Sequence, residues 1–375
     1  MIPFNKPYYS GKEKSYIAKA METKILTGDM KMIRDCESFL EKKYHFKKVF
    51  LTNSCTMALE ISALLADIQP GDEVILPSYT YVSTANAFAL RGAKLIFVDS
   101  KNAHPNMDET LIESLITDKT KAIVLVHYAG VSADFSIIQT IAKKYNLLLI
   151  EDAAQCIDGY YNSSPLGTIG DIACFSFHET KNIHCGEGGF IAINNPSLFT
   201  KAEIIRNKGT NRSAFAKGEV SKYEWIDLGF SSMPSAISAA FLFSQLEKIE
   251  KVQKKRLKLW KNYLKKLKPL QKSKHIQLPV IPKFASNNAH IFYFTCSSEK
   301  ERNDLIKFLD SNGIQAVFHY QSLHVSPYYK SKHGDRSLPN ADKYSQCLVR
   351  MPLFYDLKAE EQEFICSKVI EFYSN

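Results

Sequence analysis

Seven short apolar runs rich in Val and Ile recur between residues 48 and 193. Segments with helical periodicity separate most of them. This alternation predicts an α/β fold with a mostly parallel sheet of about seven strands, covered by helices on both faces. The predicted strands are Val49–Leu51, Glu73–Leu76, Lys94–Val98, Ala122–His127, Leu147–Ile150, Ile172–Phe177 and Phe190–Ile193.

Helices are predicted between these strands. One of them, Met107–Ile116, has a candidate capping box formed by Asn106 and Glu109. The other three predicted helices are Thr56–Ala66, Thr84–Leu90 and Phe135–Tyr145.

The pattern changes near residue 246, where Leu246–Leu267 is amphipathic and rich in Lys and Arg. Such a helix could bind nucleic acid or phosphate, but a solvated helix that links two domains is the favoured interpretation. We therefore predict a large α/β domain over residues 1–249, including an N-terminal arm, and a small α+β domain over residues 250–375. The small domain has predicted strands at His290–Cys296 and Ala316–Tyr320, and predicted helices at Lys300–Ser311 and Ala359–Tyr373.

Composition narrows the function classes only a little. The 48 Lys and Arg against 39 Asp and Glu give a net charge of +9. This positive charge could favour binding to nucleic acid, to an anionic membrane surface or to acidic substrates, or it could have no function. The first residues lack the apolar region of a secretory signal, and no run of about 18 apolar residues occurs, so we expect a cytoplasmic protein without a membrane span. Eight scattered cysteines without zinc spacing predict reduced thiols and no metal site.

In such sheets the chemistry lies in the loops beyond the carboxyl ends of the strands. Ser54, Cys55 and Thr56 follow the first strand and begin a helix, where small hydroxyl residues and backbone amides bind phosphate or simply cap the helix. Asp152 follows the fifth strand. Its carboxylate could be a metal ligand, a ribose-binding acid, the partner of a protonated ring nitrogen, or a helix cap.

Lys181 lies between two apolar strands, next to Gly188 and Gly189. Partial burial would lower the pKa of this amine and make it a nucleophile toward an aldehyde, while the glycines would let backbone approach a ligand. Tyr79 and Tyr81 lie in another strand–helix loop, where they could stack on a flat heterocycle or serve as core aromatics.

A phosphate cup, a stacking ring, a strand-end Asp and a later Lys together predict pyridoxal phosphate. The Lys would bind the aldehyde covalently, and the Asp would hold the proton of the pyridine nitrogen. Nicotinamide and P-loop readings fit worse, because neither GxGxxG after the first strand nor GxxxxGK[ST] occurs.

These motifs resemble the DegT/DnrJ/EryC1/StrS family of sugar aminotransferases, which have the aspartate-aminotransferase (type I) fold of pyridoxal-phosphate-dependent transferases. The resemblance covers nearly the whole chain and is closest to the dTDP-4-amino-4,6-dideoxygalactose transaminases. Its most specific segments are residues 54–56, 77–86, 151–155, 176–182, 186–189 and 208–213.

The resemblance implies roles for individual residues. Lys181 corresponds to the lysine that binds the cofactor and moves the proton, and Asp152 to the partner of the pyridine nitrogen. Tyr81 corresponds to the stacking aromatic, and Gln155 lies near the 3-hydroxyl edge of the ring. The implied phosphate contacts are Ser54, Cys55, Thr56 and Ser176.

Members of this family are homodimers with shared active sites, so the loop Gly229–Ser235 would reach the cofactor phosphate of a partner through Ser231 or Ser232. This chain departs from its relatives there, because Ala236 stands where they carry an acidic residue. Candidate contacts for the nucleotide sugar are Lys6, Arg212, His319 and Tyr320.

The implied reaction moves the amino group of L-glutamate to C4 of dTDP-4-dehydro-6-deoxy-D-glucose. The product would be dTDP-4-amino-4,6-dideoxy-D-galactose, for surface polysaccharides, with no nucleic-acid or membrane partner. The open alternatives are the gluco epimer, another nucleotide sugar, a pyridoxal-phosphate-binding regulatory protein, and a dehydratase of the kind that carries histidine at the position of Lys181.

Overall fold

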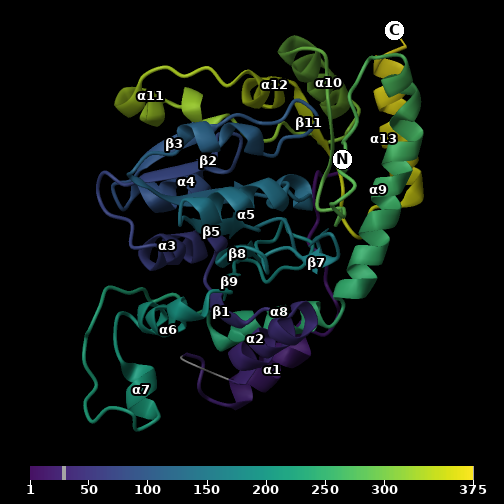
Figure 1. Ribbon diagram of the computed structural model, residues 1–375. Helices are drawn as coiled ribbons and strands as arrows, with labels where there is room; N and C mark the ends of the chain where they lie inside the picture. Colours follow the sequence, from purple (N-terminus) through teal and green to yellow (C-terminus); the bar gives the residue numbers. More distant parts are fainter. Residues whose placement is uncertain (28–30, 375) are drawn as a thin grey trace.

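A seven-stranded sheet forms the centre of the computed structural model, which describes residues 1–27 and 31–374 (Figure 1). The strand order is β1-β9-β8-β5-β4-β2-β3. All strands run in one direction except β9, which is antiparallel to both neighbours, β1 and β8. The strands are β1 Lys48–Thr52, β2 Glu73–Pro77, β3 Lys94–Val98, β4 Thr120–Val126, β5 Leu148–Asp152, β8 Ile172–Ser176 and β9 Gly189–Ile193.

This arrangement confirms the predicted α/β class and the mostly parallel sheet, with strand ends within two residues of the predicted ones. One face packs against α3 and α4, and the other against α2, α5 and α8, so each face has its own apolar core. The helices of this part are α1 Glu13–Glu22, α2 Lys31–Tyr44, α3 Cys55–Leu65, α4 Val82–Ala89, α5 Phe135–Lys144, α6 Phe199–Arg206, α7 Arg212–Ala216 and α8 Ala236–Leu246. Shorter elements are η1 Glu109–Leu111, η2 Glu113–Leu115, η3 Tyr128–Gly130, η4 Pro196–Leu198, β6 Tyr160–Tyr161 and β7 Ser164–Pro165.

The predicted helix Met107–Ile116 was wrong, because only the two 3₁₀ turns η1 and η2 form there. Asn106 does not cap them: its side chain donates to the Val131 carbonyl (2.9 Å) and accepts from the Tyr128 amide (2.8 Å). Asp108 caps η1 instead. Because the Asn106 side chain bonds to the loop after β4, it is not available for the predicted capping box, and no α-helix begins there.

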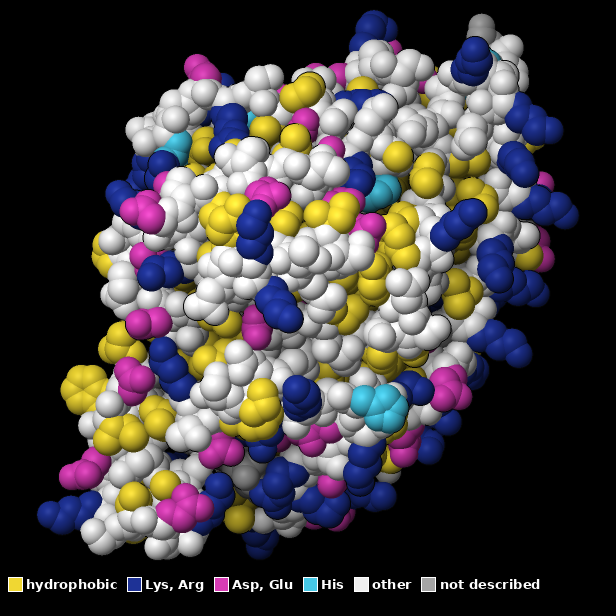
Figure 2. All heavy atoms as spheres, viewed as in Figure 1, with side chains coloured by type: hydrophobic (Ala, Val, Ile, Leu, Met, Phe, Trp, Pro, Cys, Tyr) yellow, Lys and Arg dark blue, Asp and Glu magenta, His cyan; other side chains and the backbone are white. Residues whose placement is uncertain are grey.

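The C-terminal part begins with the long helix α9 and has an apolar core of its own. In Figure 1, α9 runs beside α13, and Figure 2 shows Lys and Arg side chains along the edge that α9 forms. The predicted boundary at residue 249 is not tested and stays a prediction. The elements here are α9 Ile249–Lys272, β10 Phe292–Thr295, α10 Glu299–Ser311, η5 Leu323–Val325, α11 Pro327–His333, α12 Pro339–Cys347, β11 Leu348–Met351 and α13 Ala359–Phe372.

The predicted strand Ala316–Tyr320 was also wrong. The segment makes a single antiparallel bridge, between Val317 and Arg350 of β11. Tyr320 then adopts a left-handed backbone conformation (φ 64°), which no strand tolerates. Among the described residues, no helix is both long and apolar enough to cross a bilayer.

Asn288 ties the C-terminal part to the central sheet. Its buried amide nitrogen donates to the carbonyls of Gln155 (2.7 Å) and Ile157 (2.9 Å), and its oxygen accepts from the His290 amide (3.0 Å). The chain after β5 and the chain before β10 are therefore held by one side chain.

We predict that Asn288→Ala lowers the free energy of unfolding by about 2 to 4 kcal/mol. The Gln155 carbonyl and the His290 amide lose their partner, and the Ile157 carbonyl keeps only the longer bond from Gln253 (3.3 Å). Chemical denaturation measures this change. Asn287→Ala is the control: Asn287 is only partly buried and accepts one local bond, from the Ala289 amide, so its loss should be below about 1 kcal/mol. Equal losses for the two variants would contradict the cross-link.

Candidate active site

A cavity of about 350 Å³ lies beyond the carboxyl ends of β5 and β8. It is lined from one side by loops of the sheet and from the other by the C-terminal part of the chain. Nine of the residues predicted from the sequence line it: Ser54, Cys55, Thr56, Tyr81, Asp152, Ser176, Lys181, His319 and Tyr320.

Lys181 lies between β8 and β9 and projects into this cavity. Burial lowers the pKa of its amine, and the positive charge of Arg350 lowers it further, while the neighbouring Asp152 acts in the opposite direction. A larger fraction of the amine is therefore neutral near pH 7 than in an exposed lysine, which makes it a better nucleophile and proton acceptor.

Asp152 ends β5 and is 6% exposed. Burial raises the pKa of its carboxyl group, and two hydrogen bonds oppose that shift. The Thr84 hydroxyl donates to Oδ2 (2.6 Å), and the Ala154 amide donates to Oδ1 (3.1 Å). Because Thr84 belongs to α4, this bond also fixes the helix that Tyr81 caps.

The amino end of α3 forms one wall of the cavity. Ser54 caps the helix, since its Oγ accepts from the Met57 amide (3.1 Å), and the Thr56 hydroxyl donates to Ser83 (2.8 Å). Gly189 allows the start of α3 to pack closely against the sheet. A Cβ at this position would lie 2.6 Å from the Cys55 nitrogen and 2.5 Å from the Phe175 carbonyl oxygen. The free amides at the start of α3 are thereby pressed against the sheet, where they favour a phosphate.

Two tyrosines face each other across the cavity. Tyr81 is 58% exposed, and its ring centroid lies 6.0 Å from that of Tyr320. The Tyr320 hydroxyl accepts from Gln155 Nε2 (3.0 Å), and Gln155 Oε1 accepts from the Ala129 amide (2.7 Å). Gln155 thus lies behind Tyr320 and does not line the cavity.

His319 stacks on Tyr320, with ring centroids 3.8 Å apart, and its Nδ1 lies 2.8 Å from the Tyr128 hydroxyl. Its backbone carbonyl accepts from the Tyr79 hydroxyl. The two tyrosines of the loop after β2 therefore differ. Tyr79 is buried and supports the cavity wall that His319 and Tyr320 form, whereas Tyr81 lines the cavity.

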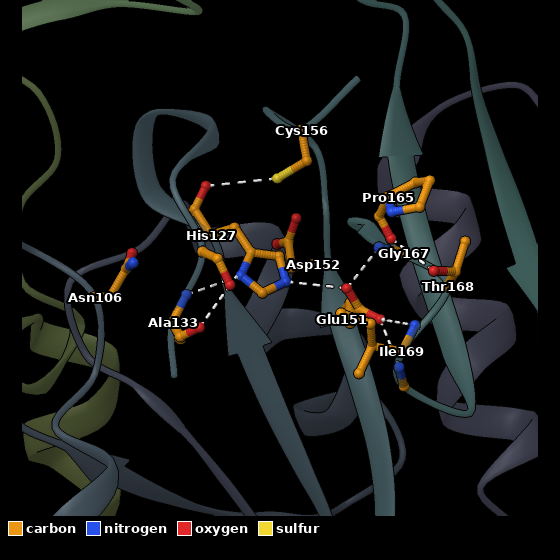
Figure 3. Close-up of polar contacts among 12 residues, drawn as sticks. Asn106, His127, Ala133, Glu151, Asp152, Cys156, Pro165, Gly167, Thr168 and Ile169 are labelled. Carbon is orange, nitrogen blue, oxygen red and sulfur yellow. Dashed lines mark hydrogen bonds and ion pairs between the residues drawn. The ribbon is translucent and has the colours of Figure 1, made fainter. Parts of the chain in front are cut away.

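A buried network supports Asp152 from behind (Figure 3). The fully buried Glu151 accepts from the amides of Gly167 (2.6 Å), Ile169 (3.1 Å) and Gly170 (2.6 Å), and its Oε2 lies 3.1 Å from His127 Nε2. These bonds fix the end of β5, and with it the position of the next residue, Asp152.

Four predicted site residues lie elsewhere in the single chain. Ser231 and Ser232 are held by Asn53, whose side chain donates to the Ser231 carbonyl (3.2 Å) and whose amide donates to the Ser232 carbonyl (2.9 Å). Arg212 begins α7, in an arm that projects away from the sheet (Figure 1). Lys6 is exposed on the N-terminal arm, and none of the four lines the cavity.

The sequence reading missed several lining residues, among them Ser83, His178, Thr180, Glu187, His290 and Arg350. His178, Thr180 and Glu187 flank Lys181 in sequence, so the motif that contains the lysine could have pointed to them. Arg350 and His290 carry no such signal. Arg350 reaches the cavity through the pairing of β11 with β10, and His290 lies just before β10, where its ring nitrogen Nδ1 lies 3.1 Å from Asn182 Oδ1.

The sequence profile of the DegT/DnrJ/EryC1/StrS aminotransferase family matches residues 7–370. The chain belongs to this family. It is 34% identical over 319 residues to a "pleiotropic regulatory protein" of Geobacillus stearothermophilus, an alignment that covers 84% of this chain and 82% of the relative.

Solved structures share the whole fold. Spr1654 of Streptococcus pneumoniae, in its PMP form, superposes with a TM-score of 0.92 at 24% identity, over 100% of this chain and 99% of that one. NtdA of Bacillus subtilis, solved with bound cofactor PMP, gives 0.87 at 27% identity, over 97% and 82%. The fold is thus the type I fold of pyridoxal-phosphate-dependent transferases.

The cavity fits the predicted cofactor. The α3 amides would receive its phosphate, Tyr81 presents an exposed ring for stacking, and the strand ends present a buried acid, Asp152, and a partly buried amine, Lys181. The close approach at Gly189 brings the helix end to this wall.

We predict that Gly189→Ala weakens pyridoxal phosphate binding about tenfold or more, because the new Cβ pushes α3 away from β8 and β9. An absorbance titration of the cofactor-free protein measures the affinity. Gly186→Ala is the control: its φ of 81° strains the backbone, but a Cβ there meets open space. Equal effects of the two substitutions would show that strain, rather than helix displacement, is responsible.

Proposed function

We propose that this chain is a pyridoxal-phosphate-dependent aminotransferase that uses L-glutamate to aminate C4 of dTDP-4-dehydro-6-deoxy-D-glucose. The proposed product is dTDP-4-amino-4,6-dideoxy-D-galactose, for surface polysaccharides. One observation carries the proposal: a partly buried lysine amine, a hydrogen-bonded carboxylate and the amino end of a helix line one cavity. Family membership supports the transfer of an amino group, and the PMP bound to NtdA supports the cofactor.

Bound pyridoxal phosphate supplies an aldehyde that binds amines covalently and a ring that withdraws electrons from the adjoining carbon. Lys181 would hold the cofactor through its aldehyde, and its neutral amine would carry a proton to and from the donor Cα. The ionised carboxylate of Asp152 would hold the cofactor at its ring nitrogen and keep that nitrogen protonated. The Thr84 hydroxyl keeps that carboxylate ionised despite its burial.

The sugar side of the cavity is proposed to include His319 and Tyr320. A homodimer would complete it, because Arg212, Ser231 and Ser232 lie away from the cavity of their own chain. Supporting this, the arm near α7 exposes Trp225 (77%), beside Tyr223 and Ile226. In such a homodimer, Lys6 and Arg212 would bind the diphosphate of the substrate. A cytoplasmic location remains a prediction.

A regulatory protein that binds pyridoxal phosphate is the second candidate, favoured by the name of the Geobacillus relative. The presence of both Lys181 and Asp152 in the cavity favours catalysis, since a sensor needs neither proton transfer nor a ring-nitrogen partner. The gluco epimer remains an alternative product, and another nucleotide sugar remains an alternative substrate. A dehydratase is disfavoured because Lys181 is present.

We predict that Lys181→Ala abolishes amino transfer and removes the absorbance band of the lysine-bound cofactor, because the only covalent link and the proton carrier are lost. Product formation from dTDP-4-dehydro-6-deoxy-D-glucose and glutamate is followed by mass spectrometry, and NMR assigns C4. Lys181→Arg is the matched control, with the charge retained but no usable nucleophile. Turnover near that of the unmodified protein in either variant would contradict the proposal.

A pH profile tests the part played by Thr84. Burial raises the pKa of Asp152 and the Thr84 bond lowers it, so Thr84→Val should raise that pKa further. Because the ionised carboxylate of Asp152 is the active form, the acid limb of the pH–rate profile should move to higher pH. At pH values above the raised pKa, the rate should return to that of the unmodified protein. Thr80→Val, one hydrogen bond farther from the carboxylate, should move it less. An unshifted limb in Thr84→Val would exclude this role.

A further inference from the structure

A row of lysines runs along the outer face of α9. The helix carries nine lysines, one arginine and a single acid, Glu250, at its start. Seven of the lysines are exposed and follow one another at alternating intervals of three and four residues, which places them on one side of the helix. This lysine stripe consists of Lys251, Lys254, Lys258, Lys261, Lys265, Lys268 and Lys272.

The opposite side of α9 is buried and holds the stripe outward. Leu259, Tyr263 and Leu267 belong to the apolar core of the C-terminal part, which fixes the rotation of the helix about its axis. Figure 1 shows α9 at the edge of the molecule, and Figure 2 shows Lys and Arg side chains along that edge. The stripe thus forms a row of positive charges about 30 Å long.

The rest of the chain does not neutralise these charges. Within the described parts of the chain, none of the seven lysines forms a hydrogen bond or an ion pair with another side chain. Lys266, which flanks the stripe, pairs with Glu363 of α13. The one acid of the helix, Glu250, pairs with Lys43 of α2 (3.0 Å) and lies outside the stripe.

Other helices pair their exposed lysines with acids on the same helix. Lys300 contacts Asp304 in α10 (2.6 Å), and Lys368 contacts Glu371 in α13 (2.8 Å). In the stripe, each lysine instead has like charges three or four positions away, which destabilises a helix. A bound anionic partner would relieve this repulsion.

We propose that the lysine stripe binds the anionic surface of a lipid bilayer. Lysine ammonium groups near such a surface are attracted to its negatively charged headgroups, which can move within the bilayer and gather beneath the row. The leucines and aromatic residues of α9 are buried or partly buried, so the binding depends on charge and is peripheral.

This inference goes beyond the proposed function and beyond the expectation that no membrane takes part. None of the seven lysines lines the active-site cavity, so the stripe and the cavity are separate surfaces. A failure of the proposed amino transfer would leave the inference intact.

A nucleic acid fits the stripe less well. Trp260 and Tyr263 are buried, so neither ring can stack on a base, and the one arginine of the helix, Arg256, is buried too. One turn of a DNA double helix is about 34 Å long, so each strand would cross a row of about 30 Å only about once. A flat surface instead contacts all seven lysines together.

Flotation of the full-length protein with lipid vesicles tests the proposal. The protein should bind vesicles of equal parts phosphatidylglycerol and phosphatidylcholine at an ionic strength of about 0.05 M, and dissociate at about 0.5 M. Vesicles of phosphatidylcholine alone should not bind it. Lys254→Gln, Lys261→Gln and Lys268→Gln in one variant should lower the partition coefficient about a hundredfold, on the order of fivefold for each lysine. The corresponding triple arginine variant should bind as the unmodified protein does.

A variant with dispersed substitutions is the matched control. Lys14→Gln, Lys143→Gln and Lys307→Gln remove the same charge from exposed positions on α1, α5 and α10. Its partition coefficient should stay within about threefold of that of the unmodified protein. Thermal unfolding checks the fold: the Tm of the stripe variant should stay the same or rise, because like-charge repulsion within α9 is reduced.

Three vesicle results would overturn the proposal. They are equal binding to the two kinds of vesicle, unchanged binding of the stripe variant, and equal losses in the stripe and dispersed variants, which would assign the binding to overall charge. A mixed-sequence DNA duplex is the competitor at equal phosphate concentration. If the duplex displaces the protein from the vesicles and its own binding is lost in the stripe variant, the partner is a nucleic acid and the proposal fails. If the protein stays on the vesicles, the lipid surface is supported.

Discussion

A buried carboxylate at the end of the central strand positions most of what matters in this protein. Glu151 is fully buried and accepts hydrogen bonds from three backbone amides of the loop before β8. With four partners including His127, its burial is compensated. Because side chains alternate along a strand, fixing Glu151 on one face fixes Asp152 on the other.

Asp152 then organises the opposite face. Its bond to Thr84 holds α4, and α4 carries the exposed ring of Tyr81 at its start. The second constraint is steric: Gly189 admits the end of α3, so its amides reach the same space. A carboxylate, an aromatic ring and the amino end of a helix thus converge from three strand ends, the position at which open α/β sheets bind ligands.

The same cavity holds ionisable groups whose burial is costly. Burial lowers the pKa of Lys181 and raises that of Asp152, so each is held in a state less favourable than in water. Arg350 is buried against the Phe4 ring, and its guanidinium group makes no hydrogen bond or ion pair among the described residues. Such costs are typical of sites built for ligands, where bound groups rather than the fold complete the hydrogen bonds and charges.

The sequence alone determined the seven strands of the central sheet, because a buried parallel sheet needs short continuous apolar runs. It also marked Lys181, Asp152 and the start of α3, because each lies at or shortly after the end of one of these strands. The sequence-based prediction failed where a side chain bonds to a distant segment. Asn106 caps no helix, because its side-chain amide forms hydrogen bonds with the backbone of Tyr128 and Val131. Only the tertiary structure decided the far wall of the cavity. Arg350 lies on β11, and His290 lies just before β10, which pairs with β11 from more than fifty residues away, while Tyr320 has a left-handed backbone. No local pattern encodes these contacts, because long-range packing alone brings them together.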